Sequence, residues 1–482
     1  MKNCLPKISP IPVIEKIKIS CSMEEVFSRF ADTPKTAFLN SSLKNDAARY
    51  SFIGRDPFFT LAGKKNDVKI EINGHPLNFK GNPFDYLDGI VKNYHIENLK
   101  DFPFVGGGIG YFSYDLKDLL ENLPDRTKDD LGISDMYFVF YQTLLIHDSL
   151  EPGNLYISVL DVLSPEAGKA GQIIKNIDSR LRGNDREDEN DSGRGKNKRN
   201  LSFPRPLSFS RKLESNFSKQ EYIKTIEKAR EYIKAGDIYQ VCLSQRFKSA
   251  WPFPAYELYQ KLNKINPSPF SAYLNFDEAK IISSSPELFL RLQNNIIETR
   301  PMKGTRPRGK TKEEDTDLKK VLEKSGKDIA ELVMIVDLER NDLGKVSVPG
   351  SVKVTEPRRI EEYPTVFQAI SVIKSTARKN VSLVDIIKAA FPGGSITGCP
   401  KIRAMEIIEE LEPIKRGVYT GAIGYISLHN TMDLNVAIRT MIVKEENVYF
   451  HTGGGITIGS DPETEYEETL HKAKALIESL RI

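Results

Sequence analysis

The acidic residues near the C-terminus have a spacing that could bind a metal cation. Asp461 and Pro462 mark the start of a helix, in which Glu465, Glu468 and Lys472 lie at positions i, i+3 and i+7. This spacing brings two carboxylates and one ammonium group to a single helix face. A solvated helix face with an ordinary Glu/Lys pair is the alternative interpretation.

A second acidic pair repeats this spacing. Asp328 and Glu331 lie at i and i+3 in residues 328–338, which otherwise have the pattern of a mostly buried helix. A buried carboxylate pair needs a partner, and Mg²⁺ accepts oxygen ligands from two helices while leaving sites open for an anionic substrate. The pattern therefore favours a Mg²⁺ site, with capped or paired structural carboxylates as the alternative.

A basic segment, RPMKGTRPR at residues 300–308, places Lys303 among three arginines. Neighbouring cations would lower the pKa of the Lys303 amine, so that some of it is neutral and available as a nucleophile or base. An exposed basic loop is the alternative, and spacing alone does not decide between them. Two Gly-rich turns, at residues 393–398 and 453–459, allow the backbone to approach an anion closely.

Capping and periodicity predict the elements that must position these residues. Ser218 and Glu221 form a capping box for a helix that ends at Gly236, and Pro400 begins another helix. Strands are expected at 105–115, 154–162, 237–247, 418–427, 435–443 and 448–450, and near Ile281. Because regular βαβ alternation is absent, the sequence predicts an α+β fold with mainly antiparallel sheets.

Composition limits the classes of partner. The 69 Lys and Arg residues nearly balance the 66 Asp and Glu residues, which argues against a nucleic-acid coat or a polybasic membrane surface. Four scattered cysteines without a CxxC pair favour a reducing cytoplasm over a disulfide framework. No stretch approaches the length and apolarity of a membrane span, and the N-terminal residues do not read as a secretory signal.

Residues 182–200 contain no aliphatic or aromatic side chain, so they cannot contribute to a packed core. This break predicts an N-terminal domain at 1–165, a polar linker at 166–213 and a catalytic domain at 214–482. GIGYFS at 108–113 and AIGYIS at 422–427 echo each other but are too short to indicate a repeat.

The second half strongly resembles the chorismate-utilising enzyme family. The segments that carry the resemblance occur in the family's order: SSSPELFL, RPMKGTRPRG, MIVDLERNDLG, GGSITGCPKIRAMEII, GAIGYIS, AIRT, GGGITIGSDPETEYEET and HKAKAL. ARYSFIG at 48–54 and GGGIGYFSYD at 106–115 resemble the N-terminal domain of anthranilate synthase and aminodeoxychorismate synthase large components. The resemblance implies two large packed antiparallel sheets with helices outside.

The resemblance also implies roles for individual residues. Glu331 and Glu468 match metal-ligating glutamates, with Asp328 and Glu465 beside them, and Mg²⁺ is the implied cofactor. Glu287 matches the general acid that protonates the departing C4 hydroxyl of chorismate. The implied substrate-binding residues are Thr305, Tyr419, Gly421, Arg439, Gly455 and Lys472.

Three positions distinguish between members of the family. Gln240 stands where isochorismate and salicylate synthases carry a lysine that activates water, so water is a poor nucleophile here. Lys303 replaces the alanine typical of anthranilate synthases and favours amination at C4, through a covalent adduct. Gln368 stands where those enzymes usually have histidine, and Leu39–Ser42 departs from their tryptophan-feedback segment.

The chain has no glutaminase nucleophile turn of the GxCxG type. The resemblance therefore implies a separate glutamine amidotransferase subunit as the source of ammonia, and an aminodeoxychorismate product that leads to 4-aminobenzoate and folate. An anthranilate synthase component, an isochorismate synthase and a catalytically silent chorismate-binding subunit are the alternatives.

Overall fold

The computed structural model describes residues 5–162, 169–182, 212–363 and 366–481. The helices in these residues are α1 (Met23–Ser28), α2 (Pro83–Asn93), α3 (Ala170–Arg182), α4 (Lys219–Ala235), α5 (Ala255–Ile265), α6 (Lys312–Lys324), α7 (Gly326–Gly344), α8 (Leu383–Ala390), α9 (Lys401–Leu411) and α10 (Pro462–Ser479), with short 3-10 helices η1 (Tyr114–Leu119) and η2 (Gly394–Ile396). No helix of these residues is long and apolar enough to span a membrane.

The strands fall into two groups along the chain. The first comprises β1 (Val13–Lys18), β2 (Ala37–Asn40), β3 (Tyr50–Lys64), β4 (Asp67–Ile72), β5 (His75–Lys80), β6 (Gly107–Phe112), β7 (Met136–Asp148) and β8 (Asn154–Val159). The second comprises β9 (Glu214–Ser215), β10 (Gln240–Ala250), β11 (Phe270–Asn275), β12 (Lys280–Ser285), β13 (Leu288–Gln293), β14 (Ile296–Arg300), β15 (Met302–Pro307), β16 (Lys353–Glu362), β17 (Val366–Thr376), β18 (Gly398–Cys399), β19 (Ala422–Ser427), β20 (Met432–Val436), β21 (Thr440–Lys444) and β22 (Asn447–Ile456).

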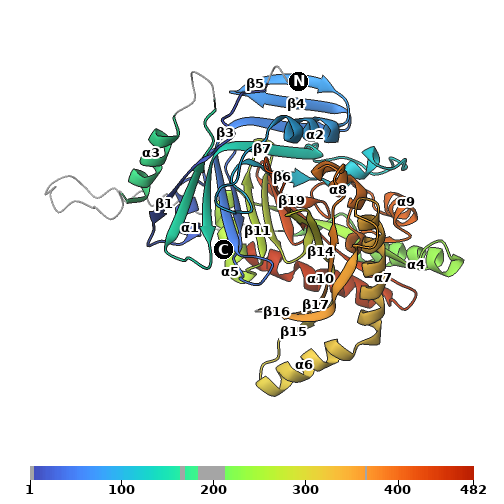
Figure 1. Ribbon diagram of the computed structural model, residues 1–482. Coiled ribbons are helices and arrows are strands. Elements are labelled where there is room, and N and C mark those ends of the chain that lie inside the picture. The colour runs from blue at the N-terminus through green and yellow to red at the C-terminus, as the bar shows by residue number, and fades with distance from the viewer. Residues whose placement is uncertain (1–4, 163–168, 183–211, 364–365, 482) are drawn as a thin grey trace.

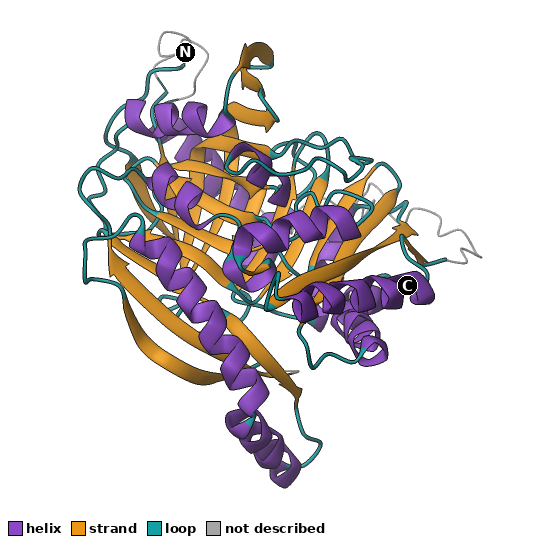
Figure 2. Cartoon of the chain, turned by 90° about the vertical axis from the view of Figure 1, so that its right-hand side faces the viewer, coloured by secondary structure: helices purple, strands orange, loops and turns teal. Residues whose placement is uncertain are grey.

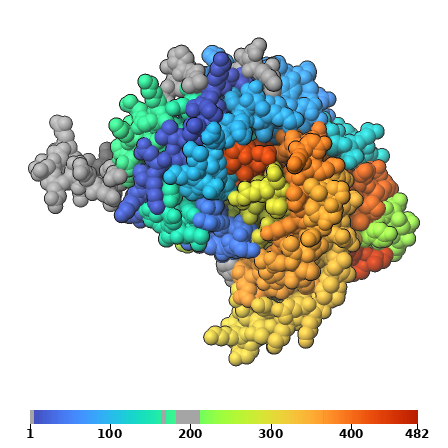
Figure 3. Space-filling view, in the orientation of Figure 1, coloured from blue at the N-terminus to red at the C-terminus, as the bar shows by residue number. Residues whose placement is uncertain are grey.

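Every ladder between these strands is antiparallel, which confirms the predicted α+β class. Hydrogen bonds join the strands into one continuous network, with helices on its outside (Figures 1 and 2). Figure 3 shows N-terminal residues in blue and residues of the second half in orange on the same face, with red and yellow segments of the second half between them.

Strands of the two halves pair directly. β2 pairs with β11, and β6 pairs with β19, so that the two echoing segments of the sequence, 108–113 and 422–427, are neighbours in the sheet. Most of the predicted linker at 166–213 lies outside the described residues, and its described part includes α3. The domain boundaries remain a prediction.

The predicted helix signals are confirmed. Ser218 and Glu221 form the capping box of α4, which ends at Gly236 with a φ of 84°. Pro400 precedes α9, and the Asp461 side chain accepts a hydrogen bond from the Thr464 N–H at the start of α10. The helix predicted at 328–338 is longer, because α7 begins at Gly326 and continues to Gly344.

Two predicted strands are interrupted where the structure needs a turn. Residues 418–421 precede β19 as a turn, and Thr420 there has a φ of 59°. The strand predicted at 435–443 is broken between β20 and β21, where Arg439 has a φ of 50°. A positive φ does not fit the extended backbone of a strand. Both interruptions fall at predicted substrate-binding residues.

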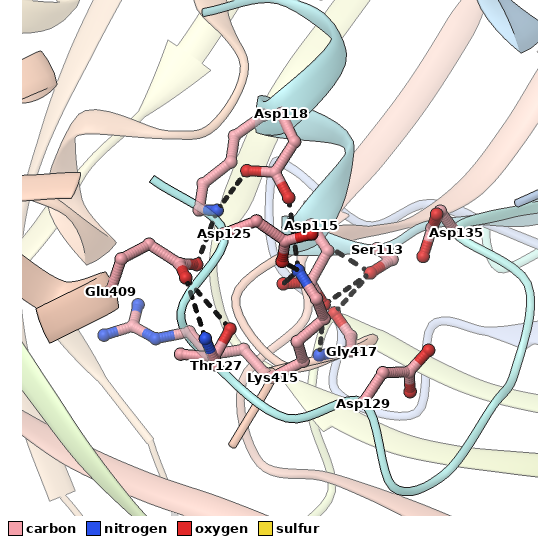
Figure 4. Close-up of polar contacts among 12 residues, drawn as sticks. Ser113, Asp115, Asp118, Asp125, Thr127, Asp129, Asp135, Glu409, Lys415 and Gly417 are labelled. Atoms are coloured by element: carbon pink, nitrogen blue, oxygen red, sulfur yellow. Dashed lines mark hydrogen bonds and ion pairs between the residues drawn. The ribbon is translucent and has the colours of Figure 1, made fainter. Parts of the chain in front are cut away.

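A buried ion-pair network anchors the turn that carries residues 418–421 (Figure 4). The Lys117 ammonium lies 2.7 Å from Glu409 Oε1, and Lys415 Nζ lies 3.1 Å from Asp125 Oδ1. The Gly417 N–H donates to Asp115 Oδ2 at 2.9 Å. We refer to Asp115, Lys117, Asp118, Asp125, Glu409 and Lys415 as the ion-pair network. It ties η1 and the segment after it to the chain just before Tyr419.

Candidate functional site

The two acidic helices contribute carboxylates to one region beside β22. Glu465 is 6% exposed and Glu331 is 9% exposed. A Cβ atom at Gly454 would lie 3.2 Å from Glu465 Oε2, 3.8 Å from Glu468 Oε1 and 4.0 Å from Lys472 Nζ. Glycine at this position therefore lets α10 place three charged groups against the strand, as the sequence spacing predicts.

Lys303 of β15 reaches the same region from the opposite side. Its Nζ lies 3.1 Å from Glu331 Oε2 on α7. A Cβ atom at Gly455 would lie 2.7 Å from Lys303 Nζ and 3.0 Å from Gln240 Nε2. Gly455 is paired with Cys242 in the β10–β22 ladder. The absence of a side chain at Gly455 thus keeps space for the lysine amine in the centre of the site.

The charge environment of Lys303 differs from the prediction. Burial favours its neutral amine, but Glu331, together with Cys242 and Glu468, outweighs burial and raises the pKa of Lys303. The three neighbouring arginines do not act on it as free cations, because each has a carboxylate of its own: Arg300 with Glu298, Arg306 with Asp328, and Arg308 with Asp315. The predicted lowering of the Lys303 pKa by these arginines is wrong.

The Asp328 carboxylate pairs with Arg306 and not with the other acidic residues of the site. Arg306 Nη2 donates to Asp328 Oδ2 at 2.8 Å, while Glu331, one turn further along α7, contacts Lys303. The i, i+3 spacing places both carboxylates on one side of the helix but gives them different partners.

Glu287 is a buried carboxyl group next to Lys303, in the turn between β12 and β13. It is 4% exposed, and the Ser395 hydroxyl of η2 donates to its Oε1 at 2.6 Å. Burial raises the pKa of Glu287 to about 7, partly offset by the bonds from Ser395 and the Met302 N–H and by the Lys303 charge. Glu287 can therefore carry a proton near neutral pH and release it, as a general acid must.

Glu331, Glu465 and Glu468 form a donor set with the chemistry that a hard cation requires. Glu331 Oε1 is buried and has no hydrogen-bond partner among the described residues, with Lys327 Nζ at 3.8 Å, so a cation could take this oxygen as a ligand. Burial raises the pKa of Glu465; burial also disfavours the charged form of Glu468, but Lys472 at 2.6 Å outweighs this and lowers its pKa.

Lysines nevertheless pair with two of these carboxylates, Glu331 and Glu468, while Glu465 accepts a hydrogen bond from Ser460. In the part of the chain that is described, no group of three or more Asp, Glu, His or Cys side chains is gathered closely enough to hold a metal ion. The residue types fit Mg²⁺, and the cation remains a proposal.

Two of the predicted substrate-binding residues, Tyr419 and Arg439, have side chains that could contact a bound substrate. Tyr419 is buried and stacks on His451 with 5.0 Å between ring centroids. Arg439 forms no ion pair with any described residue, and its Nη1 lies 3.4 Å from Asn266 Oδ1. Burial lowers the Arg439 pKa. An enclosed guanidinium without a carboxylate is well suited to bind an anionic ligand.

Three other predicted binding residues, Lys472, Thr305 and Gly421, have contacts with the backbone or lie exposed at a strand. Lys472 Nζ donates to the Gly453 carbonyl at 3.0 Å. Thr305 is exposed and pairs with Gln368 in the β15–β17 ladder. A Cβ atom at Gly421 would lie 1.9 Å from the Phe112 carbonyl oxygen, so glycine is required there for contact with the N-terminal half.

Two residues near Glu287 and Lys303 were not predicted from the sequence to belong to the site, namely Ser395 and Glu339. Ser395 was visible only as part of the turn at 393–398, and nothing in that pattern indicated a bond to Glu287. Glu339 belongs to the charged end of α7, yet it is only 8% exposed and its Oε2 accepts a hydrogen bond from Thr299 Oγ1 at 2.9 Å. The only feature of the sequence that could have indicated a buried role for Glu339 is its position as a charged residue on a mostly apolar helix.

Leu39–Ser42 lies away from Lys303. Leu39, Asn40 and Ser41 line a separate cavity of about 310 Å³ that also involves Arg291 and Asp433. This region is therefore distinct from the carboxylate and lysine cluster, and the expectation about tryptophan feedback remains untested.

Comparison with known proteins identifies the family. The family described as chorismate binding enzyme matches residues 36–478. The chain is 39% identical over 459 residues to anthranilate synthase component 1 of Acetivibrio thermocellus, covering 94% of this chain and 92% of that protein. It is 36% identical over 464 residues to aminodeoxychorismate synthase component 1 of Bacillus subtilis (strain 168), covering 96% and 95%.

A solved structure agrees with these matches. The crystal structure of anthranilate synthase component I from Streptococcus pneumoniae TIGR4 superimposes with a TM-score of 0.74 at 32% identity, covering 90% of this chain and 93% of that one. The family match extends over both halves of the chain, and Glu287, Lys303, Glu331 and Glu468 lie within its range. The chain therefore belongs to the family of chorismate-binding enzymes.

Proposed function

We propose that this enzyme aminates chorismate at C4 to give 4-amino-4-deoxychorismate. The observation that carries the proposal is the position of the Lys303 amine, in contact with Glu331 and Gly455 and close enough to Glu287 to affect its pKa. A primary amine in the centre of the site supplies a nucleophile that an aliphatic side chain at the same position would lack.

The first step forms a covalent adduct. The neutral Lys303 amine attacks C2 of chorismate, the two conjugated ring double bonds move from C1–C2 and C5–C6 to C1–C6 and C4–C5, and the C4–oxygen bond breaks. Glu287 gives its proton to the departing hydroxyl group, which leaves as water. Because Glu331 favours the ammonium form, Lys303 must lose a proton before it attacks.

The second step restores the lysine. Ammonia attacks C4, both ring double bonds shift back to C1–C2 and C5–C6, and the bond between C2 and the lysine nitrogen breaks. Glu287 is then an anion and can accept the proton released by the incoming nitrogen. The sum of the two steps is chorismate plus ammonia giving aminodeoxychorismate plus water.

Glu331, Glu465 and Glu468 would hold Mg²⁺, with Asp328 beside them, and a bound Mg²⁺ supplies positive charge for the substrate's ring carboxylate. Arg439 and Tyr419 would position the carboxylate groups of chorismate, and Lys472 would add charge at the entrance. Gln240 supports addition of ammonia rather than water, because an amide cannot act as the general base that water requires.

An anthranilate synthase component remains a second candidate. The relatives with 39% identity carry that name, whereas the aminodeoxychorismate synthase relative has 36% identity. These values differ too little to decide the product, and the residue at position 303 is the feature that favours amination at C4.

We further propose that ammonia comes from a separate glutamine amidotransferase subunit, since the sequence contains no glutaminase turn. The product would serve synthesis of 4-aminobenzoate for folate. Cys21, Cys242 and Cys399 are free thiols, which supports a reducing cytoplasmic location.

The test combines product identification with trapping of the adduct. Purified protein is supplied with chorismate, Mg²⁺ and an ammonium salt, and products are separated by chromatography and weighed by mass spectrometry. We expect aminodeoxychorismate; anthranilate as the main product would overturn the proposal. Glutamine should not replace the ammonium salt unless the amidotransferase subunit is added.

In a parallel reaction without ammonia, part of the enzyme should carry chorismate less one water on Lys303. Lys303→Ala should carry no adduct, and its rate of aminodeoxychorismate formation should fall by orders of magnitude. Lys310→Ala, which alters an exposed lysine seven residues away, should retain both adduct and rate. A wild-type rate for Lys303→Ala would contradict the covalent mechanism even if the product is correct.

A further inference from the structure

The strand β22 carries a buried imidazole, that of His451, on the face that it turns toward the candidate site. Successive side chains of a strand point to opposite faces, so His451 lies on the same face as Gly455. A Cβ atom at Gly455 would lie 2.7 Å from Lys303 Nζ, whereas one at Gly454 would lie 3.2 Å from Glu465 of α10. His451 is 3% exposed. Its ring is therefore enclosed on the Lys303 side of the strand.

The His451 ring stacks on the phenol ring of Tyr419. The two ring centroids lie 5.0 Å apart, with 11° between the ring planes. Nearly parallel rings at this separation are offset from one another, which is an arrangement that aromatic pairs prefer. Tyr419 is itself buried, so the contact is shielded from water. The stack joins β22 to the turn at 418–421, two segments that are distant in the sequence.

The two nitrogen atoms of the His451 ring do not explain why the side chain is buried. Neither Nδ1 nor Nε2 has a hydrogen-bond partner among the described residues. Burial, with Arg246 and Arg416 nearby, holds the pKa of His451 well below its usual range, so the imidazole is neutral. A buried polar group without a partner is unfavourable and needs another reason to be kept. The flat ring that stacks on Tyr419 supplies such a reason.

The backbone around Tyr419 does not set the direction of its phenol ring. The Tyr419 N–H donates to the Arg416 carbonyl at 3.2 Å, and the Tyr419 carbonyl accepts from the Thr420 hydroxyl at 2.6 Å. These bonds fix the turn, whereas the side-chain torsions are limited by the groups that pack on the ring. The Arg416 guanidinium lies 6.0 Å from the Tyr419 centroid, and the His451 ring lies parallel to the phenol. The imidazole thus supplies the flat surface that sets the plane of the phenol.

We propose that His451 is a positioning residue, whose ring holds the Tyr419 phenol in the orientation that binds chorismate. The proposal rests on the role of Tyr419 in the proposed function. A phenol that could rotate would have to be ordered when the substrate binds, and this loss of freedom would weaken binding. A ring that is already held by stacking avoids this loss. His451 therefore contributes to substrate binding and not to the chemical step.

Two substitutions at His451 separate the effect of a flat ring from that of filled space. His451→Phe keeps an aromatic ring, whereas His451→Leu fills much of the space without one. Chorismate consumption is measured at saturating ammonium, and circular dichroism checks the fold of each variant. We expect His451→Leu to raise the KM for chorismate about three- to tenfold and to leave kcat within about twofold of wild type. His451→Phe should keep both values within about twofold of wild type.

A double-mutant cycle tests whether the effect passes through Tyr419. Tyr419→Leu should itself raise the KM for chorismate. Adding His451→Leu to Tyr419→Leu should cause no further increase, because the ring that His451 positions is then absent. If His451→Phe folds poorly, this cycle decides the question by itself.

Tyr449→Leu is the matched control. It removes another ring from the same face of β22, two residues from His451. The Tyr449 ring packs against Arg246 and Lys248, whose charged groups lie 5.3 Å and 5.8 Å from its centroid. Because Tyr449 is not stacked on the Tyr419 ring, this variant should leave both KM and kcat unchanged.

Three results would overturn the role of His451 alone: an unchanged KM in His451→Leu while Tyr419→Leu raises it, a raised KM that His451→Phe does not reverse, or additive effects in the cycle. A wild-type KM in Tyr419→Leu would instead remove Tyr419 from the proposed function, and the role of His451 with it. Chorismate consumption is measured irrespective of product, so formation of anthranilate would overturn the proposed product without affecting this test.

Discussion

Buried charges occur in two regions of this molecule, the candidate site around Lys303 and the ion-pair network below residues 418–421. In the network, Lys117 is fully buried between Glu409 at 2.7 Å and Asp118 at 2.5 Å. In the site, Glu287 is similarly buried but its named partners are a hydroxyl and a backbone N–H rather than a cation at ion-pair distance. The buried charge is compensated at Lys117 in the network and poorly compensated at Glu287 in the site.

The pKa values of Glu409 and Glu287 reflect this difference, although burial raises the pKa of Asp115 in the network to about 6. Burial disfavours ionisation of Glu409, but the Lys117 charge outweighs it and lowers the pKa of Glu409. Burial is not outweighed at Glu287, whose pKa rises to about 7. A group that must exchange protons during a reaction cannot be fixed by a strong ion pair. The comparison indicates that the network maintains the shape of the site while the site retains groups that can react.

The largest expected effect is on catalysis. Glu287→Gln removes the proton donor and should reduce kcat by about 10² to 10⁴. Circular dichroism should show an unchanged fold, since the substitution preserves the shape of the side chain. Turnover at the wild-type rate would show that the buried carboxyl is structural, and the contrast between the two regions would disappear.

Breaking the network should instead affect stability. Lys117→Met leaves the buried Glu409 carboxylate without its ion-pair partner, whereas Asp118 keeps Lys415 at 3.2 Å, and the change should lower the free energy of unfolding by about 3–5 kcal/mol. Urea denaturation measures this change. Adding Glu409→Gln to Lys117→Met should restore part of the stability, because the uncompensated charge is then gone.

Glu287→Gln should increase stability above neutral pH. The unfolded carboxyl ionises near pH 4.5 and the folded one near pH 7, so the folded protein binds more protons between these values and loses stability as pH rises through that interval. Glutamine removes this loss, and the variant should be more stable than wild type by about 1–3 kcal/mol at pH 8. At pH 4 the two proteins should unfold at the same urea concentration.

The smallest expected effect is a reduced kcat when the space that Gly455 leaves beside the Lys303 amine is filled. Gly455→Ala would place a Cβ atom 2.7 Å from Lys303 Nζ, so the lysine must shift, and kcat should fall by about tenfold. Gly459→Ala is the control, because its Cβ would have no atom within 4 Å. Steady-state kinetics with chorismate compares the two variants; equal rates would contradict the assigned position of the Lys303 amine.

The sequence determined the elements and the chemistry of several site residues. Local signals such as the Ser218 capping box and the Asp461 N-cap depend on contacts within four residues, and helix spacing alone placed Glu465, Glu468 and Lys472 on one face. Motif resemblance identified Glu287, Glu331 and Arg439 as candidates. These inferences needed no knowledge of how distant segments pack.

Only the tertiary structure decided how these residues are partnered. Lys303 is close in sequence to three arginines, yet its electrostatic environment is dominated by Glu331, 28 positions away, because side-chain charges act through space rather than along the chain. Arg439 was predicted within a continuous strand, but long-range packing breaks that strand at a positive φ. Folding also brings Glu339 of α7 to the η2 turn that supports Glu287, although the two segments are far apart in the sequence. Sequence patterns do not encode such proximity, since burial and nearby charges set the state of an ionisable group only after the chain has folded.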